Sequence, residues 1–134
     1  MPIKKGVKEL VDEAINSIET VSTEEAINLL EDPDTLFVDI RDVRELDREG
    51  MIPNAFHAPR GMLEFWVDPK SPYYKDFFSS DKKTYLLYCQ SAWRSALATK
   101  TLKNMGMENV KHFSDGFNGW KKAGGPVAQR KSKK

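Results

Sequence analysis

The chain has 134 residues, of which 40% are hydrophobic and 31% charged, and its formal net charge is +1. This length and composition are typical of one globular domain that buries its own core. The small net charge gives no reason to expect nucleic acid or an anionic membrane as a partner, and no apolar run is long enough to span a bilayer. The single cysteine excludes an internal disulfide and favours a reducing compartment, so we expect the protein in the cytoplasm.

The first part of the chain predicts two helices and two strands. Hydrophobic residues recur at helical spacing over residues 5–18, which predicts an amphipathic helix packed on its own domain; contact with a second copy is the less favoured alternative. A short strand over residues 18–21 is followed by Ser22 and Glu25, a capping-box pair that predicts a short helix. The nearly all-apolar run over residues 36–40 predicts a strand covered on both faces.

The middle of the chain is less regular. Residues 41–54 are dense in charge and predict a short helix followed by a turn, and residues 55–59 predict a third, short strand. Residues 60–83 form a long connection with prolines in its centre. We expect helical turns over residues 61–66 and 73–78, on either side of that loop.

The last third predicts alternating strands and helices. A central strand, a long helix, a last strand and a final short helix are expected over residues 84–88, 94–105, 109–113 and 115–120. Strands that alternate with helices indicate an α/β domain with a mainly parallel sheet, whose ligand site lies beyond the carboxyl ends of the strands. We expect residues 1–128 to form one domain and the basic residues 129–134 to be a disordered tail.

Cys89 follows directly on the central strand, at that edge of the sheet. Four residues separate it from Arg94, where the long helix begins. Backbone N–H groups of such a loop can point at an anion, and a helix N-terminus adds positive potential, so the loop favours an anionic sulfur. The alternative is a buried, inert thiol, which is the common state of a lone cysteine.

Four segments of the chain resemble those of the rhodanese-like sulfurtransferases. They are Val-Asp-Ile-Arg at 38–41, Gly-Met-Ile-Pro-Asn-Ala-Phe-His-Ala-Pro at 50–59, Cys-Gln-Ser-Ala-Trp-Arg-Ser at 89–95, and Asp-Gly-Phe-Asn-Gly-Trp at 115–120 with Gly-Gly-Pro-Val at 124–127. Together they span about residues 20–128. Met51, Asn54 and Ala92 depart from the family pattern, which often has histidine, glycine and glycine at these positions.

The resemblance implies a fold and a reaction. The family fold is a five-stranded parallel sheet flanked by helices on both faces. The implied reaction moves sulfane sulfur from a small anionic donor such as thiosulfate to Cys89, which becomes a persulfide. Cyanide, a thiol or a protein then accepts the sulfur. The covalent persulfide implies no cofactor.

The resemblance also assigns roles within the loop. Backbone N–H groups from Gln90 to Arg94 would hold the donor and the persulfide, and Arg94 would add positive charge. The side chains of Gln90 and Ser91 either bind donor oxygens or do not, and Trp93 either walls the pocket or packs. Ala92 replaces a glycine that tolerates any backbone angle, and alanine resists a positive φ.

Other charged residues are candidates for the surroundings of the site. We expect Asp39 and Arg41 to form a structural ion pair. Arg60 is either part of an electropositive rim or a solvated surface residue. His57 is a less favoured general base, because a thiolate stabilised by the loop needs none, and His112 is expected to be structural. No Cys/His cluster has metal-binding spacing.

Two other functions compete with sulfur transfer. Related phosphatases also use a cysteine-to-arginine loop, but five residues separate the two there and four do here. The shorter loop suits a sulfur atom better than a tetrahedral phosphate ester. A rhodanese-like module that only binds a partner protein is the third hypothesis, although such modules often lack the cysteine.

Overall fold

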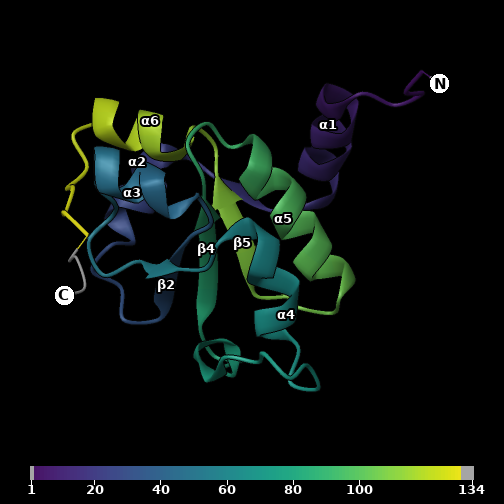
Figure 1. Ribbon diagram of the computed structural model, residues 1–134. Helices are drawn as coiled ribbons and strands as arrows, with labels where there is room; N and C mark the ends of the chain where they lie inside the picture. The colour runs from purple at the N-terminus through teal and green to yellow at the C-terminus, as the bar shows by residue number, and fades with distance from the viewer. Residues whose placement is uncertain (1, 131–134) are drawn as a thin grey trace.

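Five parallel strands form one sheet, in the order β1-β5-β4-β2-β3, in the computed structural model, which describes residues 2–130 (Figure 1). The strands are β1 (Thr20–Val21), β2 (Thr35–Asp39), β3 (Phe56–His57), β4 (Thr84–Tyr88) and β5 (Val110–Phe113). The central strand β4 is the most protected, since it pairs with β2 on one side and β5 on the other. Cys89 therefore follows a strand in the middle of the sheet, as expected.

Helices cover both faces of the sheet. They are α1 (Val7–Ser17), α2 (Thr23–Asn28), α3 (Val43–Glu49), α4 (Leu63–Val67), α5 (Trp93–Asn104) and α6 (Gly116–Lys122), with 3₁₀ turns η1 (Arg60–Met62) and η2 (Asp76–Phe78). In Figure 1, α1, α4 and α5 lie on one side of the sheet, and α2, α3 and α6 on the other. Each helix within residues 2–130 is too short or too polar to cross a membrane.

The two faces of β4 feed two separate cores. Tyr85 and Leu87 belong to the core under α4 and α5, whereas Leu86 and Tyr88 belong to the core under α2 and α6. All four side chains are buried. This explains the nearly continuous apolar run of the strand, because a parallel sheet covered on both faces has no solvent side.

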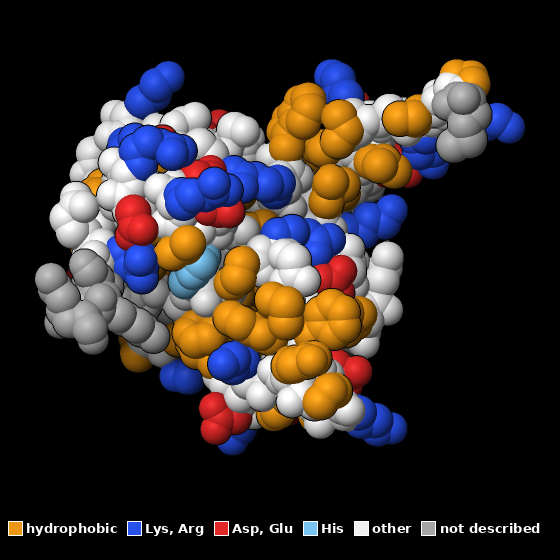
Figure 2. Space-filling model, in the orientation of Figure 1, with side chains coloured by type: hydrophobic (Ala, Val, Ile, Leu, Met, Phe, Trp, Pro, Cys, Tyr) orange, Lys and Arg blue, Asp and Glu red, His pale blue; other side chains and the backbone are white. Residues whose placement is uncertain are grey.

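Helix α1 packs on α5. Val11 and Ala14 are buried against Ala96 of α5, so the amphipathic helix predicted over residues 5–18 lies on its own domain. Other hydrophobic side chains of α1, such as Val7, stay exposed. Figure 2 shows hydrophobic side chains gathered over this part of the molecule.

Some local expectations differ from the structure. The helical turn expected over residues 73–78 is only the 3₁₀ turn η2, because this segment packs through its rings: Phe77 stacks on Phe56 with ring centroids 4.0 Å apart. Of the tail expected to be disordered, residues 131–134 lie outside the described residues. Arg130 is described, and its guanidinium contacts Asp47 at 2.8 Å.

Candidate active site

Cys89 lies between the end of β4 and the start of α5, at the carboxyl edge of the sheet. Its side chain is 1% exposed and belongs to the core under α5. The Sγ atom accepts a hydrogen bond from the backbone N–H of Ser95 at 3.3 Å. Ser95 is in the first turn of α5, where N–H groups have no partner inside the helix, so the helix presents one of these donors to the sulfur.

The loop after Cys89 is a set of unused hydrogen-bond donors. None of the backbone N–H groups from Gln90 to Arg94 donates to an acceptor among residues 2–130. Consecutive N–H groups of this kind form a concave site for an anion. The loop can therefore stabilise negative charge on a sulfur or on oxygens held above it.

Helix α6 holds the other side of this loop. The N–H of Phe117 donates to the carbonyl of Cys89 at 2.8 Å, and the N–H of Asn118 donates to the carbonyl of Gln90 at 3.1 Å. Gly116 makes this approach possible: its φ is +63°, and a Cβ there would lie 2.8 Å from the Cys89 carbonyl oxygen. The Asp-Gly segment at 115–116 thus positions the cysteine loop, although 26 residues separate Gly116 from Gln90 in sequence.

Ala92 occupies the point at which the loop turns into α5. Its φ is 75° and its ψ is 0°, so an alanine adopts the left-handed conformation for which the family pattern often has glycine. The neighbouring side chains of Ser91 and Trp93 are exposed, and Trp93 keeps 46% of its surface in contact with solvent. Of the two roles considered for Trp93, its exposure favours lining the mouth over packing in the core.

Arg94 is paired, which the sequence alone did not predict. Its two terminal nitrogens contact the two carboxylate oxygens of Glu45, each at 2.9 Å. The guanidinium holds the pKa of Glu45 below its usual range by hydrogen bonding. The positive charge expected from Arg94 is therefore partly compensated by a carboxylate of α3.

Asp39 and Arg41 form a fully buried ion pair, 2.7 Å apart at its shortest contact. Arg41 also donates to the side-chain oxygen of Gln90 at 2.9 Å and stacks its guanidinium over the ring of Phe117 at 4.3 Å. A buried pair with these extra bonds has its charges satisfied. It connects the end of β2 to the cysteine loop and to α6.

The side chain of Gln90 is already engaged by protein groups. Besides accepting from Arg41, its amide nitrogen donates to Glu49 at 2.9 Å and to Asn118 at 2.7 Å. It is therefore occupied by these bonds, and its backbone N–H is the group that can face a donor. Glu49 and Asn118 support the loop but were not identified from the sequence, because no local pattern joins residues 28 or 41 positions apart.

The remaining candidates lie away from the sulfur or are bound to other groups. Arg60 contacts Glu64 at 2.8 Å, which compensates its charge. The Nε2–H of His57 donates to the carbonyl of Arg41 at 2.7 Å, so the ring serves the backbone. His112 is hydrogen-bonded through Nδ1 to the hydroxyl of Ser95 at 2.9 Å, and burial lowers its pKa to about 4.

Within residues 2–130, no group of three or more His, Cys, Asp or Glu side chains is arranged to hold a metal ion. The site therefore consists of one thiol, a ring of backbone donors and two compensated arginines. Its chemistry is nucleophilic attack by sulfur, followed by stabilisation of an anionic adduct in the loop.

Comparison with known proteins identifies the group to which this site belongs. The family model described as "Rhodanese-like domain" matches residues 22–123. A structure of RPA3614 from Rhodopseudomonas palustris, a protein of unknown function described as a possible tyrosine phosphatase, is 48% identical, covers 96% of this chain and 98% of that chain, and superposes with a TM-score of 0.92.

Two further relatives are more distant. The polysulfide-sulfur transferase homodimer of Wolinella succinogenes is 29% identical, with 92% of this chain and 87% of that chain covered and a TM-score of 0.70. The uncharacterized protein slr1261 of Synechocystis is 32% identical over 97 residues, which are 72% of this chain. The chain spans about half the length of that curated relative, 49%.

Proposed function

We propose, since the chain belongs to the rhodanese-like domain family, that it is a sulfurtransferase in which Cys89 carries sulfane sulfur from a donor such as thiosulfate to an acceptor. The observation that carries this proposal is the position of Cys89 at the base of a loop whose N–H groups, from Gln90 to Arg94, have no acceptor among residues 2–130. Rhodanese-like sulfurtransferases work through a covalent cysteine persulfide and need no cofactor. The likeness to a polysulfide-sulfur transferase supports the same chemistry.

The reaction has two balanced steps. The Cys89 thiolate attacks the outer sulfur of thiosulfate, the sulfur–sulfur bond of the donor breaks, and sulfite leaves with the bonding electron pair. The outer sulfur of the new persulfide carries the negative charge and is held by the loop N–H groups. Cyanide or a thiolate then attacks that outer sulfur, and Cys89 leaves as a thiolate.

The groups around the sulfur share this work. Ser95 donates its N–H to the Cys89 sulfur, and the backbone of the loop faces the donor. Arg94 contributes a charge that Glu45 partly compensates, so the N–H groups are the larger source of stabilisation. His57 serves the backbone of Arg41 and takes no part as a base.

A cysteine-dependent phosphatase is the second candidate, because RPA3614 is described as a possible tyrosine phosphatase. Only four residues separate Cys89 from Arg94, which makes a small cradle for a phosphate ester. The hydroxyl of Ser95 is bonded to His112, while the cysteine sulfur receives the backbone N–H of Ser95. Both observations favour the sulfurtransferase.

The first experiment measures sulfur loading by intact-mass analysis. Thiosulfate is expected to add one sulfur atom per chain, and cyanide is expected to remove it. Cys89→Ser, checked for folding by circular dichroism, is expected to show no adduct. An adduct that persists in this variant contradicts the role of Cys89. No adduct in the parent with any sulfane donor would favour a module that only binds a partner.

The second experiment separates the two enzymes. Thiosulfate-to-cyanide transfer and hydrolysis of an aryl phosphate are measured on the same preparation, each with Cys89→Ser as the control. Sulfur transfer that depends on Cys89, with little hydrolysis, is the expected result. Robust hydrolysis that disappears in Cys89→Ser would reverse the order of the two functions.

The setting of the protein is also a proposal. We place residues 1–128 in one domain, with α1 as an addition before the matched family region. A free thiol that must stay reduced to work suits the cytoplasm. The partners are then a small sulfur-donor anion and a thiol or protein acceptor, without nucleic acid or a membrane.

A further inference from the structure

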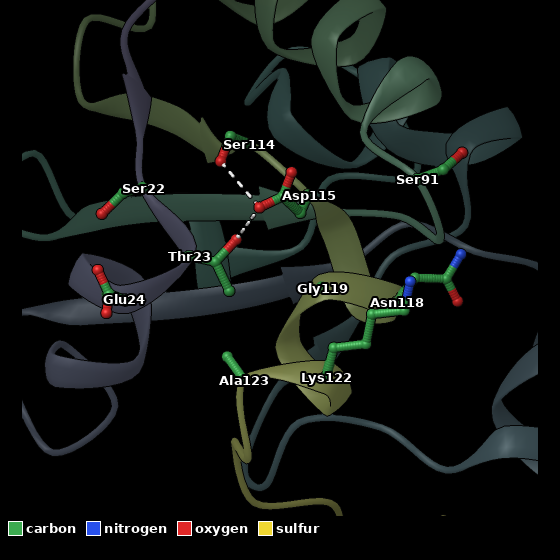
Figure 3. A pocket seen from close by; sticks show the side chains of 10 residues that line it. All are labelled: Ser22, Thr23, Glu24, Ser91, Ser114, Asp115, Asn118, Gly119, Lys122 and Ala123. Atoms are coloured by element: carbon green, nitrogen blue, oxygen red, sulfur yellow. Dashed lines mark hydrogen bonds between the residues drawn. The ribbon is translucent and has the colours of Figure 1, made fainter.

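A pocket of about 720 Å³ adjoins the cysteine loop (Figure 3). It lies between the start of α2, the connection from β5 to α6, and Ser91 of the loop. This volume is within the range of small-molecule sites, so the pocket has room for more than a single inorganic anion.

The pocket and the loop share a wall. Ser91, two residues after Cys89, lines the pocket, and so does Asn118. Asn118 is bonded twice to Gln90, since its N–H donates to the Gln90 carbonyl and its side-chain oxygen accepts from the Gln90 amide at 2.7 Å. A molecule in the pocket is therefore next to the sulfur carrier.

Charges of both signs line the pocket. Lys122 and Glu24 form no ion pair with any group of residues 2–130. In Figure 3 the Lys122 side chain extends toward Asn118, whereas Glu24 lies across the pocket from it. Asp115 adds a second carboxylate, of which one oxygen accepts from Thr23 at 2.9 Å.

This pattern of charges defines the molecule that would fit. An uncompensated ammonium on one side attracts a carboxylate, and uncompensated carboxylates on the other attract an ammonium group. Thiosulfate and cyanide carry no positive charge and would use only half of the pocket. Amino-acid and peptide thiols carry both groups together with the sulfur that a persulfide needs as its acceptor.

We propose that this pocket is the acceptor site and that the acceptor is a small zwitterionic thiol, with Lys122 holding its carboxylate and Glu24 its ammonium group. The proposal rests on the sulfurtransferase function proposed above. In the step it serves, the acceptor thiolate attacks the outer sulfur of the Cys89 persulfide. The new bond joins acceptor sulfur to outer sulfur, the persulfide bond breaks, Cys89 leaves as thiolate, and no redox partner is needed.

The test loads Cys89 with thiosulfate and measures its discharge by four thiols. Cysteine has both charged groups, cysteamine has only the ammonium group, 3-mercaptopropionate has only the carboxylate, and 2-mercaptoethanol has neither. Rates are divided by the thiolate fraction of each compound at the assay pH. Cysteine is expected to be fastest and 2-mercaptoethanol slowest.

Two variants assign the charges. Lys122→Met is expected to slow discharge by cysteine and 3-mercaptopropionate roughly fivefold and to leave cysteamine unchanged. Glu24→Gln is expected to slow cysteine and cysteamine by a similar factor and to leave 3-mercaptopropionate unchanged. Lys82→Met and Glu31→Gln, which remove the same charges next to the opposite ends of the strands, are matched controls. Discharge by cyanide is expected to stay constant in all four variants.

Two kinetic results would overturn the proposal. One is a normalised rate for cysteine no higher than that for 2-mercaptoethanol. The other is a loss of cyanide discharge in Lys122→Met or Glu24→Gln equal to the loss with cysteine, because these residues would then act on the loop itself.

A binding measurement keeps this test separate from the proposed function. S-methylcysteine, which cannot accept sulfur, is titrated into the unloaded protein while the amide signals of Ser91 and Gly119 are followed by NMR. Shifts in the parent that are lost in the Lys122→Met/Glu24→Gln double variant support the pocket, and their absence in the parent contradicts it. If no persulfide forms with any donor, sulfur transfer fails, and the titration still decides whether the pocket binds this class of molecule.

Discussion

Ala92 adopts a backbone conformation that costs an L-residue free energy. Its φ of 75° is in the left-handed region, where the Cβ of alanine is crowded by roughly 1 kcal/mol. The N–H groups on either side of Ala92 form the anion cradle, so the turn is part of the site and is retained in spite of its cost.

Replacing Ala92 by glycine is therefore expected to stabilise the protein. The gain in the free energy of unfolding is up to about 1 kcal/mol, reduced by the extra freedom of glycine in the unfolded chain. Urea denaturation measures the change. Ala98→Gly is the matched control within α5, where no strain is relieved and a loss of about 1 kcal/mol is expected. A loss of stability in Ala92→Gly would mean that this turn is not strained.

Arg94 is expected to have a modest effect on the reactivity of Cys89. Its side chain is 42% exposed and bound to Glu45, and both facts weaken its field at the sulfur. Arg94→Ala should slow persulfide formation and alkylation of Cys89 by roughly two- to fivefold at neutral pH. His57→Ala, which removes a ring bonded to the Arg41 carbonyl, should change these rates less. If the His57 variant lost the reactive thiol and the Arg94 variant kept it, a cysteine–histidine pair would replace activation by the loop.

At the scale of elements, the contact between α6 and the cysteine loop depends on Gly116. Alanine at this position would place its Cβ 2.7 Å from the Gln90 carbonyl oxygen and would also adopt a φ of +63°. We expect Gly116→Ala to lower the free energy of unfolding by roughly 1–3 kcal/mol and to slow persulfide formation at least tenfold, because the loop is displaced.

Gly124→Ala is the control for this prediction. Gly124 also has a positive φ, +83°, but a Cβ there would meet no atom within 4 Å. The control is therefore expected to show the backbone strain alone, with sulfur transfer intact. A Gly116 variant that transfers sulfur at the parent rate would show that the loop does not depend on this approach of α6.

The regular elements were predictable where a short pattern decides them. The apolar run at 84–88, which ends at a cysteine and leads into a helix, predicted β4, the loop and α5 within one or two residues. The start of α3 was not identified, although Asp42 and Glu45 form a complete capping box, because the surrounding segment is so rich in charge. Residues 73–78 were misjudged because ring packing, and not periodicity, determines their path.

The site shows the same division. Cys89 and its donors follow from local spacing, so the sequence was sufficient to propose them. The partners of Arg94 and Gln90 are Glu45 and Asn118, which lie 49 and 28 residues away along the chain. Their side chains meet only because the strands of one parallel sheet end at the same edge. Such contacts leave no signal in a single sequence.

At the scale of the whole molecule, His112 joins three elements. Its ring is hydrogen-bonded to Thr20 of β1 and to Ser95 of α5 while its backbone is part of β5, and its side chain is almost completely buried. Burial lowers its pKa to about 4 in the folded protein, whereas the unfolded chain has an ordinary value of about 6.5. Between these values the unfolded state binds a proton that the folded state does not.

The protein should therefore lose stability as the pH falls through this window. The effect of His112 is absent above pH 6.5, grows by up to about 1.4 kcal/mol per pH unit below it, and reaches on the order of 3 kcal/mol near pH 4. Urea denaturation between pH 7 and pH 5 avoids most carboxylate titration. His112→Asn is expected to remove this slope whatever its own stability, and His57→Asn is expected to keep it. A parent whose stability is flat from pH 7 to pH 5 would show that His112 is protonated inside the fold.

The burial of a single thiol also determines how this protein meets oxidants. A sulfenic acid formed on Cys89 has no second cysteine in the chain with which to close a disulfide. Its reduction then requires a thiol from another molecule, which must reach a sulfur that is 1% exposed. Oxidation beyond that stage to a sulfinic acid would be permanent for the carrier atom. The working lifetime of each molecule under oxidative stress is therefore determined by the supply of reducing thiols around it.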